Sequence, residues 1–193
     1  MVTPNVPNVL TLLRILLVPV LLVALLDKTP SGDLLAAIVF AVASFTDAID
    51  GYLARSRGAV TNFGKLMDPL ADKLLIIAPL VSLVSLGRIA AWVAMVIIAR
   101  EFAITALRML AVEQGVVIAA STLGKLKTIT QVAAIFAVIA VSSTPLWVDL
   151  LVYLAVLTTV ASGADYFFGL RRRIEDARRE RSRSQAQRAS YSP

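Results

Sequence analysis

The chain has 193 residues, of which 58% are hydrophobic, and its mean hydropathy is +0.80, so it is too apolar for an ordinary soluble domain. It contains neither Cys nor His, which excludes disulfides, thiol chemistry and imidazole as a general base or zinc ligand. The net charge of +6 does not indicate a nucleic-acid partner, because most of it comes from Arg residues in segment 171–193, directly after an apolar run.

The first predicted membrane span covers residues 9–26 and begins with polar side chains at helical spacing. Asn8, Thr11 and Arg14 are three residues apart, which places them on one side of a helix. Two interpretations are open for them. They either cap the helix and anchor it at the membrane surface, or they form a polar site that faces the other spans.

The second and third predicted spans, residues 34–55 and 66–86, carry two pairs of carboxylates. Asp47 and Asp50 are three residues apart, and Asp68 and Asp72 are four apart, so each pair projects from one helical face. Asp47 lies about 20 Å along its span and is therefore expected below the membrane surface. Both pairs are expected on the same side of the membrane.

Two acidic faces of this kind, brought together, would form an oxygen-rich cage that suits Mg²⁺ or Mn²⁺. The alternative is that Asp68 caps the third span, with Pro69 in its first turn, while Asp47 and Asp50 are solvated at a helix end. Acidic side chains inside a membrane are costly and are functional as a rule. We therefore predict a divalent metal site.

The fourth and fifth predicted spans, residues 89–112 and 124–141, add further charged side chains. Glu101 and Arg108 share one helical face, and Arg100 lies about a quarter turn away. They form either part of the site or a buried structural ion pair. The fifth span opens with Lys125 and Lys127, on the same side of the membrane as the acids.

The sixth predicted span covers residues 146–170 and leads into a basic tail, residues 171–193, which we expect to be helical at first and then disordered. The sequence thus predicts an all-α integral membrane protein with about six transmembrane helices, a membrane-embedded domain at 1–170 and a tail at 171–193. Six spans leave both termini on one side. The positive-inside rule assigns that side, with the acids, to the cytoplasm, and the tail to contact with anionic lipids of the cell membrane.

The acidic stretch also carries a resemblance to a known family. Its spacing, D-x2-D-G-x2-A-R-x8-G-x3-D-x3-D, resembles the CDP-alcohol phosphotransferase signature at every position. Such enzymes transfer a substituted phosphate from a CDP-linked donor to an alcohol and release CMP. The resemblance implies two Mg²⁺ or Mn²⁺ ions and Asp72 as the general base. The metal ligands that it implies are Asp47, Asp50, Asp68 and Asp72.

The resemblance also implies a binding site for the CDP-linked donor. The cytidine nucleotide packs against small residues in this family, and Arg55 either holds the nucleotide or braces the acids. The donor-binding residues implied in this way are Asn8, Thr11, Gly51, Ala54, Arg55 and Gly64.

The segments that flank the signature resemble the bacterial branch of the family that joins CDP-diacylglycerol to sn-glycerol 3-phosphate. For that acceptor, we expect Arg108, Lys125 and Lys127 to bind the phosphate. The alternative for the two lysines is that they act only as positive-inside signals. The same chemistry with inositol phosphate, serine or phosphatidylglycerol stays open, as does a divalent-cation transporter whose acids line the ion path. We also expect a homodimer.

Overall fold

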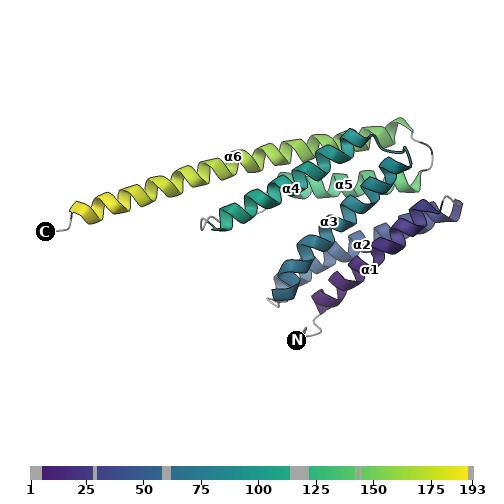
Figure 1. Ribbon diagram of the computed structural model, residues 1–193, viewed down its shortest axis with the longest axis horizontal. Coiled ribbons are helices and arrows are strands. Elements are labelled where there is room, and N and C mark those ends of the chain that lie inside the picture. The colour runs from purple at the N-terminus through teal and green to yellow at the C-terminus, as the bar shows by residue number, and fades with distance from the viewer. Residues whose placement is uncertain are drawn as a thin grey trace.

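A computed structural model describes the backbone of residues 6–27, 30–57, 62–113, 122–141, 143 and 145–190. Within these ranges, the side chains of residues 6–8, 30, 48–57, 62–66, 68–69, 173–174 and 176–190 are not described. The described backbone forms six helices, which confirms the predicted all-α architecture. They are α1 (Val6–Leu26), α2 (Pro30–Arg57), α3 (Asn62–Ser85), α4 (Ala91–Glu113), α5 (Thr122–Ala140) and α6 (Leu146–Ser190) (Figure 1).

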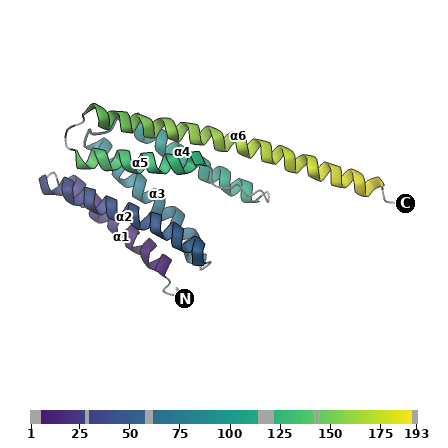
Figure 2. The same ribbon diagram turned by 180° about the vertical axis from the view of Figure 1, so that it is seen from behind.

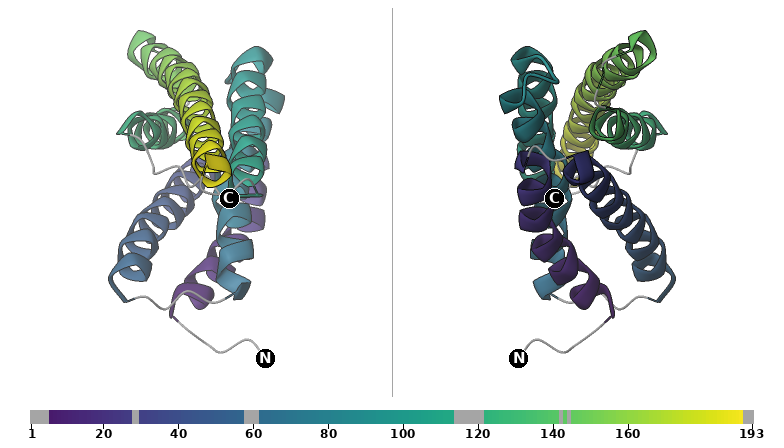
Figure 3. Two further views of the ribbon diagram at one scale, coloured as in Figure 1. Left: turned by 90° about the vertical axis from the view of Figure 1, so that its left-hand side faces the viewer. Right: turned by 90° about the vertical axis from the view of Figure 1, so that its right-hand side faces the viewer.

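The helices form two groups of three. Helix α1 packs against α2 and α3, and α6 packs against α4 and α5. The groups meet where α2 and α3 contact α5, and where α3 contacts α4. Figures 1 and 2 show the two groups from opposite sides, and Figure 3 shows them end-on. The acidic signature therefore belongs to one group, and the predicted acceptor-binding cations belong to the other.

One apolar core joins the two groups. Its buried side chains include Leu21, Phe40, Leu83, Val93, Ile139 and Val148. On α2, Ala36, Ala37 and Ala43 are also buried, and such small residues let helices approach closely. Large apolar side chains on the outer faces, such as Leu34 and Phe45, are exposed, as expected for helices that face lipid.

Three helices are long and apolar enough to cross a membrane, judged by length and composition. Among the described residues, these stretches are Val9–Leu26 in α1, Thr122–Ala140 in α5 and Leu146–Arg172 in α6. In α2, α3 and α4, charged residues such as Asp47, Lys73 and Arg100 interrupt the apolar runs. The helices with mixed composition are thus the ones that carry the acids and the predicted ion pair.

The turn between α3 and α4 is tied to the start of α2. The amide of Gly87 donates to the carbonyl of Val84 (3.0 Å), and the amide of Arg88 donates to that of Leu83 (2.9 Å). This capping pattern needs a left-handed residue, and Gly87 supplies it with φ of 71°. Arg88 Nη2 then donates to Asp33 Oδ2 (2.8 Å). The ion pair holds α2 and α3 together at the end opposite the acidic signature.

Helix α6 continues past the predicted end of its span at residue 170 and runs to Ser190. Figure 1 shows it extending well beyond α4 and α5 toward the C-terminus. Arg171 Nε donates to Glu175 Oε1 (3.0 Å), four residues further along, a spacing that supports a helix. The start of the basic tail is therefore helical, while the division of the chain at residue 170 stays a prediction.

Candidate active site

The candidate site is organised around Arg14, a side chain of α1 that is only 2% exposed. Its Nη2 lies 3.0 Å from Asp47 Oδ1 on α2, and its Nη1 lies 3.0 Å from Asp72 Oδ1 on α3. One guanidinium reaches both carboxylates, so the acids of α2 and α3 lie side by side. The expectation that the two acidic faces meet therefore agrees with the geometry of Asp47 and Asp72.

Burial of Arg14 decides between the two interpretations of the polar start of α1. Thr11, one turn earlier on α1, is also only 2% exposed. Both side chains therefore face the other helices, and Arg14 is not an anchor at the membrane surface. Asn8 lies in α1, but its side chain is outside the described residues. Sequence analysis did not assign Arg14 to the site, although its three-residue spacing from Thr11 carried the signal.

The donor set fits a hard divalent cation. Asp47 and Asp72 offer only oxygen ligands, and their side chains are 35% and 51% exposed, so an ion can reach them. Arg14 lies 3.0 Å from Oδ1 of each carboxylate. Asp50 and Asp68 lie in α2 and α3, but their side chains are not described. Among the described residues, no group of three potential metal ligands occurs. The role of Asp50 and Asp68 in the site therefore stays a prediction.

The side chains of the remaining predicted donor-binding residues are also outside the described part of the structure. Gly51, Ala54 and Arg55 belong to α2, and Gly64 belongs to the first turn of α3, but all four lie outside the residues whose side chains are described. Their contact with a nucleotide stays a prediction.

A second polar cluster lies between α4, α5 and α6. Lys127 of α5 is 7% exposed, and its Nζ donates to Glu101 Oε1 on α4. Arg100 Nη1 is 3.4 Å from the same oxygen, and Arg100 Nη2 donates to Ser162 Oγ on α6 (2.6 Å). Helices α4 and α5, which carry the two cations and the acid of this cluster, both contact α3. The cluster therefore belongs to helices that pack against one of the acidic helices.

The other two predicted acceptor-binding cations are exposed. The Arg108 guanidinium lies 5.9 Å from the centre of the Tyr166 ring on α6, within range of a cation–π contact. Lys125 is exposed in the first turn of α5. Lys127 thus contacts Glu101, and Arg108 contacts Tyr166. Among the described residues, no hydrogen bond or ion pair joins the three predicted cations to one another.

Two hydrogen-bonded pairs fix α5 against α6 beside this cluster. The hydroxyls of Thr130 and Thr158 are 2.7 Å apart, and Gln131 Nε2 donates to Thr159 Oγ1 (2.9 Å). All four side chains are buried. Buried polar pairs of this kind hold helices in a defined register in a bilayer, and either pair alone would still join α5 to α6.

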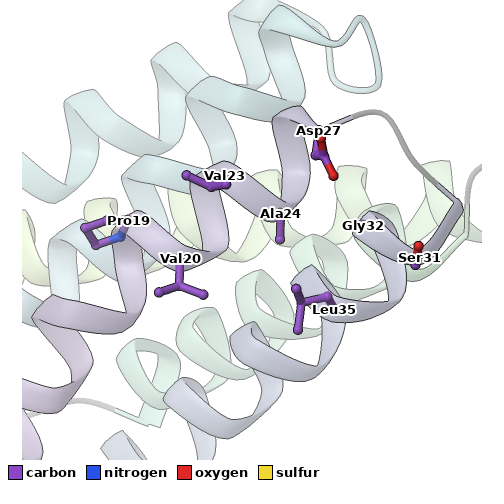
Figure 4. A pocket seen from close by; sticks show the side chains of 8 residues that line it. All are labelled: Pro19, Val20, Val23, Ala24, Asp27, Ser31, Gly32 and Leu35. Carbon is purple, nitrogen blue, oxygen red and sulfur yellow. The ribbon is translucent and has the colours of Figure 1, made fainter.

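A groove of about 420 Å³ lies between α1 and α2, at the end of these helices away from Arg14. Figure 4 shows its lining, which is largely apolar and includes Pro19, Val20 and Leu35, with Asp27 and Ser31 at one end. None of the predicted site residues lines it. It is therefore separate from the candidate site.

Comparison with known proteins identifies close relatives. The profile of the family described as CDP-alcohol phosphatidyltransferase matches residues 4–161. A CDP-diacylglycerol–glycerol-3-phosphate 3-phosphatidyltransferase of Bacillus subtilis is 43% identical over 181 residues, which cover 84% of this chain and 93% of the relative. A probable phosphatidylglycerophosphate synthase of Mycobacterium tuberculosis is 43% identical over 167 residues, covering 84% and 79%. An enzyme of Rickettsia bellii with the same name as the Bacillus relative is 36% identical over 169 residues, covering 84% and 93%.

Removing the two acids should destabilise the protein more than removing Arg14. The double variant Asp47→Ala, Asp72→Ala leaves a buried guanidinium without these carboxylates, at a cost of about 3–5 kcal/mol. Arg14→Met leaves two carboxylates that water can reach, so we expect a smaller loss of about 1–2 kcal/mol. Thermal unfolding in detergent, with a chelator present, measures both. A larger loss of stability for Arg14→Met than for the double variant would contradict this account of the contacts between Arg14, Asp47 and Asp72.

Proposed function

The chain belongs to the CDP-alcohol phosphatidyltransferase family, and we propose that it transfers the phosphatidyl group of CDP-diacylglycerol to sn-glycerol 3-phosphate. The products are phosphatidylglycerophosphate and CMP. The observation that carries this proposal is the 43% identity, over 84% of the chain, to a relative named for that reaction. The protein is a multi-pass membrane enzyme, and family membership removes the alternative of a cation transporter.

The family uses divalent metal ions, and we propose two such ions for this protein, the number that the resemblance of its signature implies. When bound, they neutralise the diphosphate of the donor and stabilise the charge that develops on the leaving phosphate. The residues that hold them are Asp47, Asp50, Asp68 and Asp72. Arg14 keeps the carboxylates of Asp47 and Asp72 together, which supports a site formed jointly by α2 and α3.

Asp72 acts as the general base in this proposal. Its carboxylate accepts the proton of the attacking glycerol hydroxyl while that oxygen forms a bond to the phosphorus of the phosphatidyl group. The bond from this phosphorus to the bridging oxygen breaks, and CMP leaves with that oxygen. Asp72 suits the role because it is half exposed, so the acceptor can reach it, while Arg14 limits its movement.

The donor and the acceptor use different helices. The nucleotide packs along α2 and the start of α3, and the donor-binding residues are Asn8, Thr11, Gly51, Ala54, Arg55 and Gly64. The phosphate of the acceptor binds to Arg108, Lys125 and Lys127 on α4 and α5. The contact of the α2–α3 pair with α5 supports this division, because it brings the two sets of helices together. A homodimer stays a prediction from the resemblance.

Turnover by purified protein tests the function and the metal together. With CDP-diacylglycerol, we expect CMP release with sn-glycerol 3-phosphate but not with serine, inositol phosphate or phosphatidylglycerol. Chelation should abolish it, and Mg²⁺ or Mn²⁺ should restore it. Each of Asp47→Asn, Asp50→Asn and Asp68→Asn should lower kcat/KM by at least a hundredfold, since each removes charge from the ions.

Within that experiment, Asp72→Asn separates the base from the other acids. Its kcat should fall far more than its affinity for CDP-diacylglycerol. An unchanged kcat for this variant would exclude Asp72 as the base. Preferred turnover with another acceptor would replace the proposed substrate while leaving the reaction class intact.

The acceptor site is tested by neutralising its cations one at a time. Arg108→Gln, Lys125→Met and Lys127→Met should each raise the KM for glycerol 3-phosphate about tenfold or more, the scale of one charged hydrogen bond. The KM for CDP-diacylglycerol should change much less. Arg172→Gln, which removes an exposed cation of α6, is the matched control and should change neither KM. Equal effects on both substrates would rule this pocket out.

We propose that the acids and both termini face the cytoplasm. The cations Arg171 and Arg172 are exposed on α6, while Arg88 at the opposite end is paired with Asp33, so the ends differ in charge as the positive-inside rule requires. In this Cys-free chain, Ser31→Cys should react with a membrane-impermeant thiol reagent on intact cells. Glu175→Cys should react with the same reagent only after the membrane has been permeabilised. The reverse pattern would overturn the orientation.

A further inference from the structure

A chain of four polar side chains crosses the second helix group, from Ser162 of α6 through Arg100 and Glu101 of α4 to Lys127 of α5. Ser162 is 1% exposed and accepts a hydrogen bond of 2.6 Å from Arg100 Nη2. Arg100 Nη1 and Lys127 Nζ both approach Glu101 Oε1. We propose that Arg100, held by Ser162, is a positioning residue that acts through Glu101 to aim Lys127 at the phosphate of the acceptor. This inference rests on the proposed function.

The first argument is charge. A structural ion pair needs one cation for one anion, but this cluster holds two cations, Arg100 and Lys127, against the single carboxylate of Glu101. Among the described residues, Glu101 is the only acid in recorded contact with either cation. The neighbouring polar side chains of α5 and α6 are neutral and bonded to each other. An unbalanced positive charge between apolar helices is costly, and a bound anion removes that cost.

The second argument is geometry. Lysine carries its charge on a flexible stem, so it points reliably at a ligand only if another group holds it. Glu101 supplies that hold, and its own carboxylate is steered by Arg100. The stem of Arg100 crosses α6 closely, since a Cβ at Gly163 would lie 3.4 Å from Arg100 Cγ. Helix α6 thus influences the position of the Lys127 charge through Arg100 and Glu101, in addition to its direct packing against α5.

The same face of α6 supports the other arginine of α4. Tyr166, four residues after Ser162, lies under the guanidinium of Arg108. Residues four apart share one helix face, so a single stripe of α6 holds both Arg100 and Arg108. The family profile ends at residue 161, so both supporting residues lie just beyond the matched segment. We therefore expect the preference for a phosphorylated acceptor to depend on α6 as well as on α4 and α5.

The variant Ser162→Ala tests the relay, with Thr159→Ala as the matched control. Both remove one buried hydroxyl from α6, but Thr159 bonds to Gln131 and has no recorded contact with Arg100. We expect Ser162→Ala to raise the KM for glycerol 3-phosphate about threefold or more, less than direct loss of a charged hydrogen bond because it acts at one remove. The KM for CDP-diacylglycerol should not change. Thr159→Ala should change neither KM, whatever it does to thermal stability.

A double-mutant cycle separates positioning from general support. If Ser162 acts through Lys127, the variant Ser162→Ala, Lys127→Met should have the KM of Lys127→Met alone. Additive increases in KM would overturn the relay. Glu101→Gln gives a second route, since the neutral isostere should raise the same KM about tenfold without a matching change for CDP-diacylglycerol.

The outcomes for this inference and for the proposed function are distinguishable. No turnover of glycerol 3-phosphate by the unmodified enzyme overturns both. Turnover that is weakened by Lys127→Met but not by Ser162→Ala or Glu101→Gln overturns the relay alone. A KM increase that follows the loss of thermal stability in both Ser162→Ala and Thr159→Ala also overturns it, because it indicates a loosened helix pair.

Discussion

The first helix group depends on one buried guanidinium. Arg14 is buried, while the two carboxylates that it contacts are partly exposed to solvent. Loss of the two acids should therefore cost more stability than loss of the arginine. This asymmetry fixes the rotation of α1 relative to α2 and α3, because only one rotation gives Arg14 both partners. The proposed site for divalent cations would thereby be assembled around a cation that belongs to the protein. Carboxylates that would repel one another are kept within reach of each other before any ion binds.

The two groups of helices divide the electrostatic work of the site. Helices α2 and α3 supply the acids, whereas α4 and α5 supply an excess of buried or half-buried cations. A reaction between a metal-bound diphosphate and a phosphorylated alcohol must hold two anions close together, which costs energy unless each has its own counter-charges. In the proposed function, separate helix groups would meet that requirement, since the acids and the cations lie on different helices.

The sequence predicted the helices, their order and the convergence of acids, because long apolar runs and fixed spacings are local signals. It did not predict the pairings. Spacing grouped Asp47 with Asp50 and Asp68 with Asp72, whereas the structure joins Asp47 to Asp72 through a residue from a third helix. It left Arg100 and Glu101 open between part of the site and a structural ion pair, and it missed Lys127 and Ser162 as the outer members of their cluster. Such partners are 26 to 62 residues apart, and only the relative rotation of packed helices decides between them.

The ion pair between Arg88 and Asp33 makes α2 a lever. About 20 Å of helix separate Asp33 from Asp47, so a rotation of only about 3° at the clamped end displaces the acid by about 1 Å. A displacement of that size is enough to break a hydrogen bond of normal length. The end of α2 that carries this ion pair, remote from the candidate site, would therefore help to set the position of Asp47. Changes in bilayer thickness that tilt these helices reach the acids through the same lever.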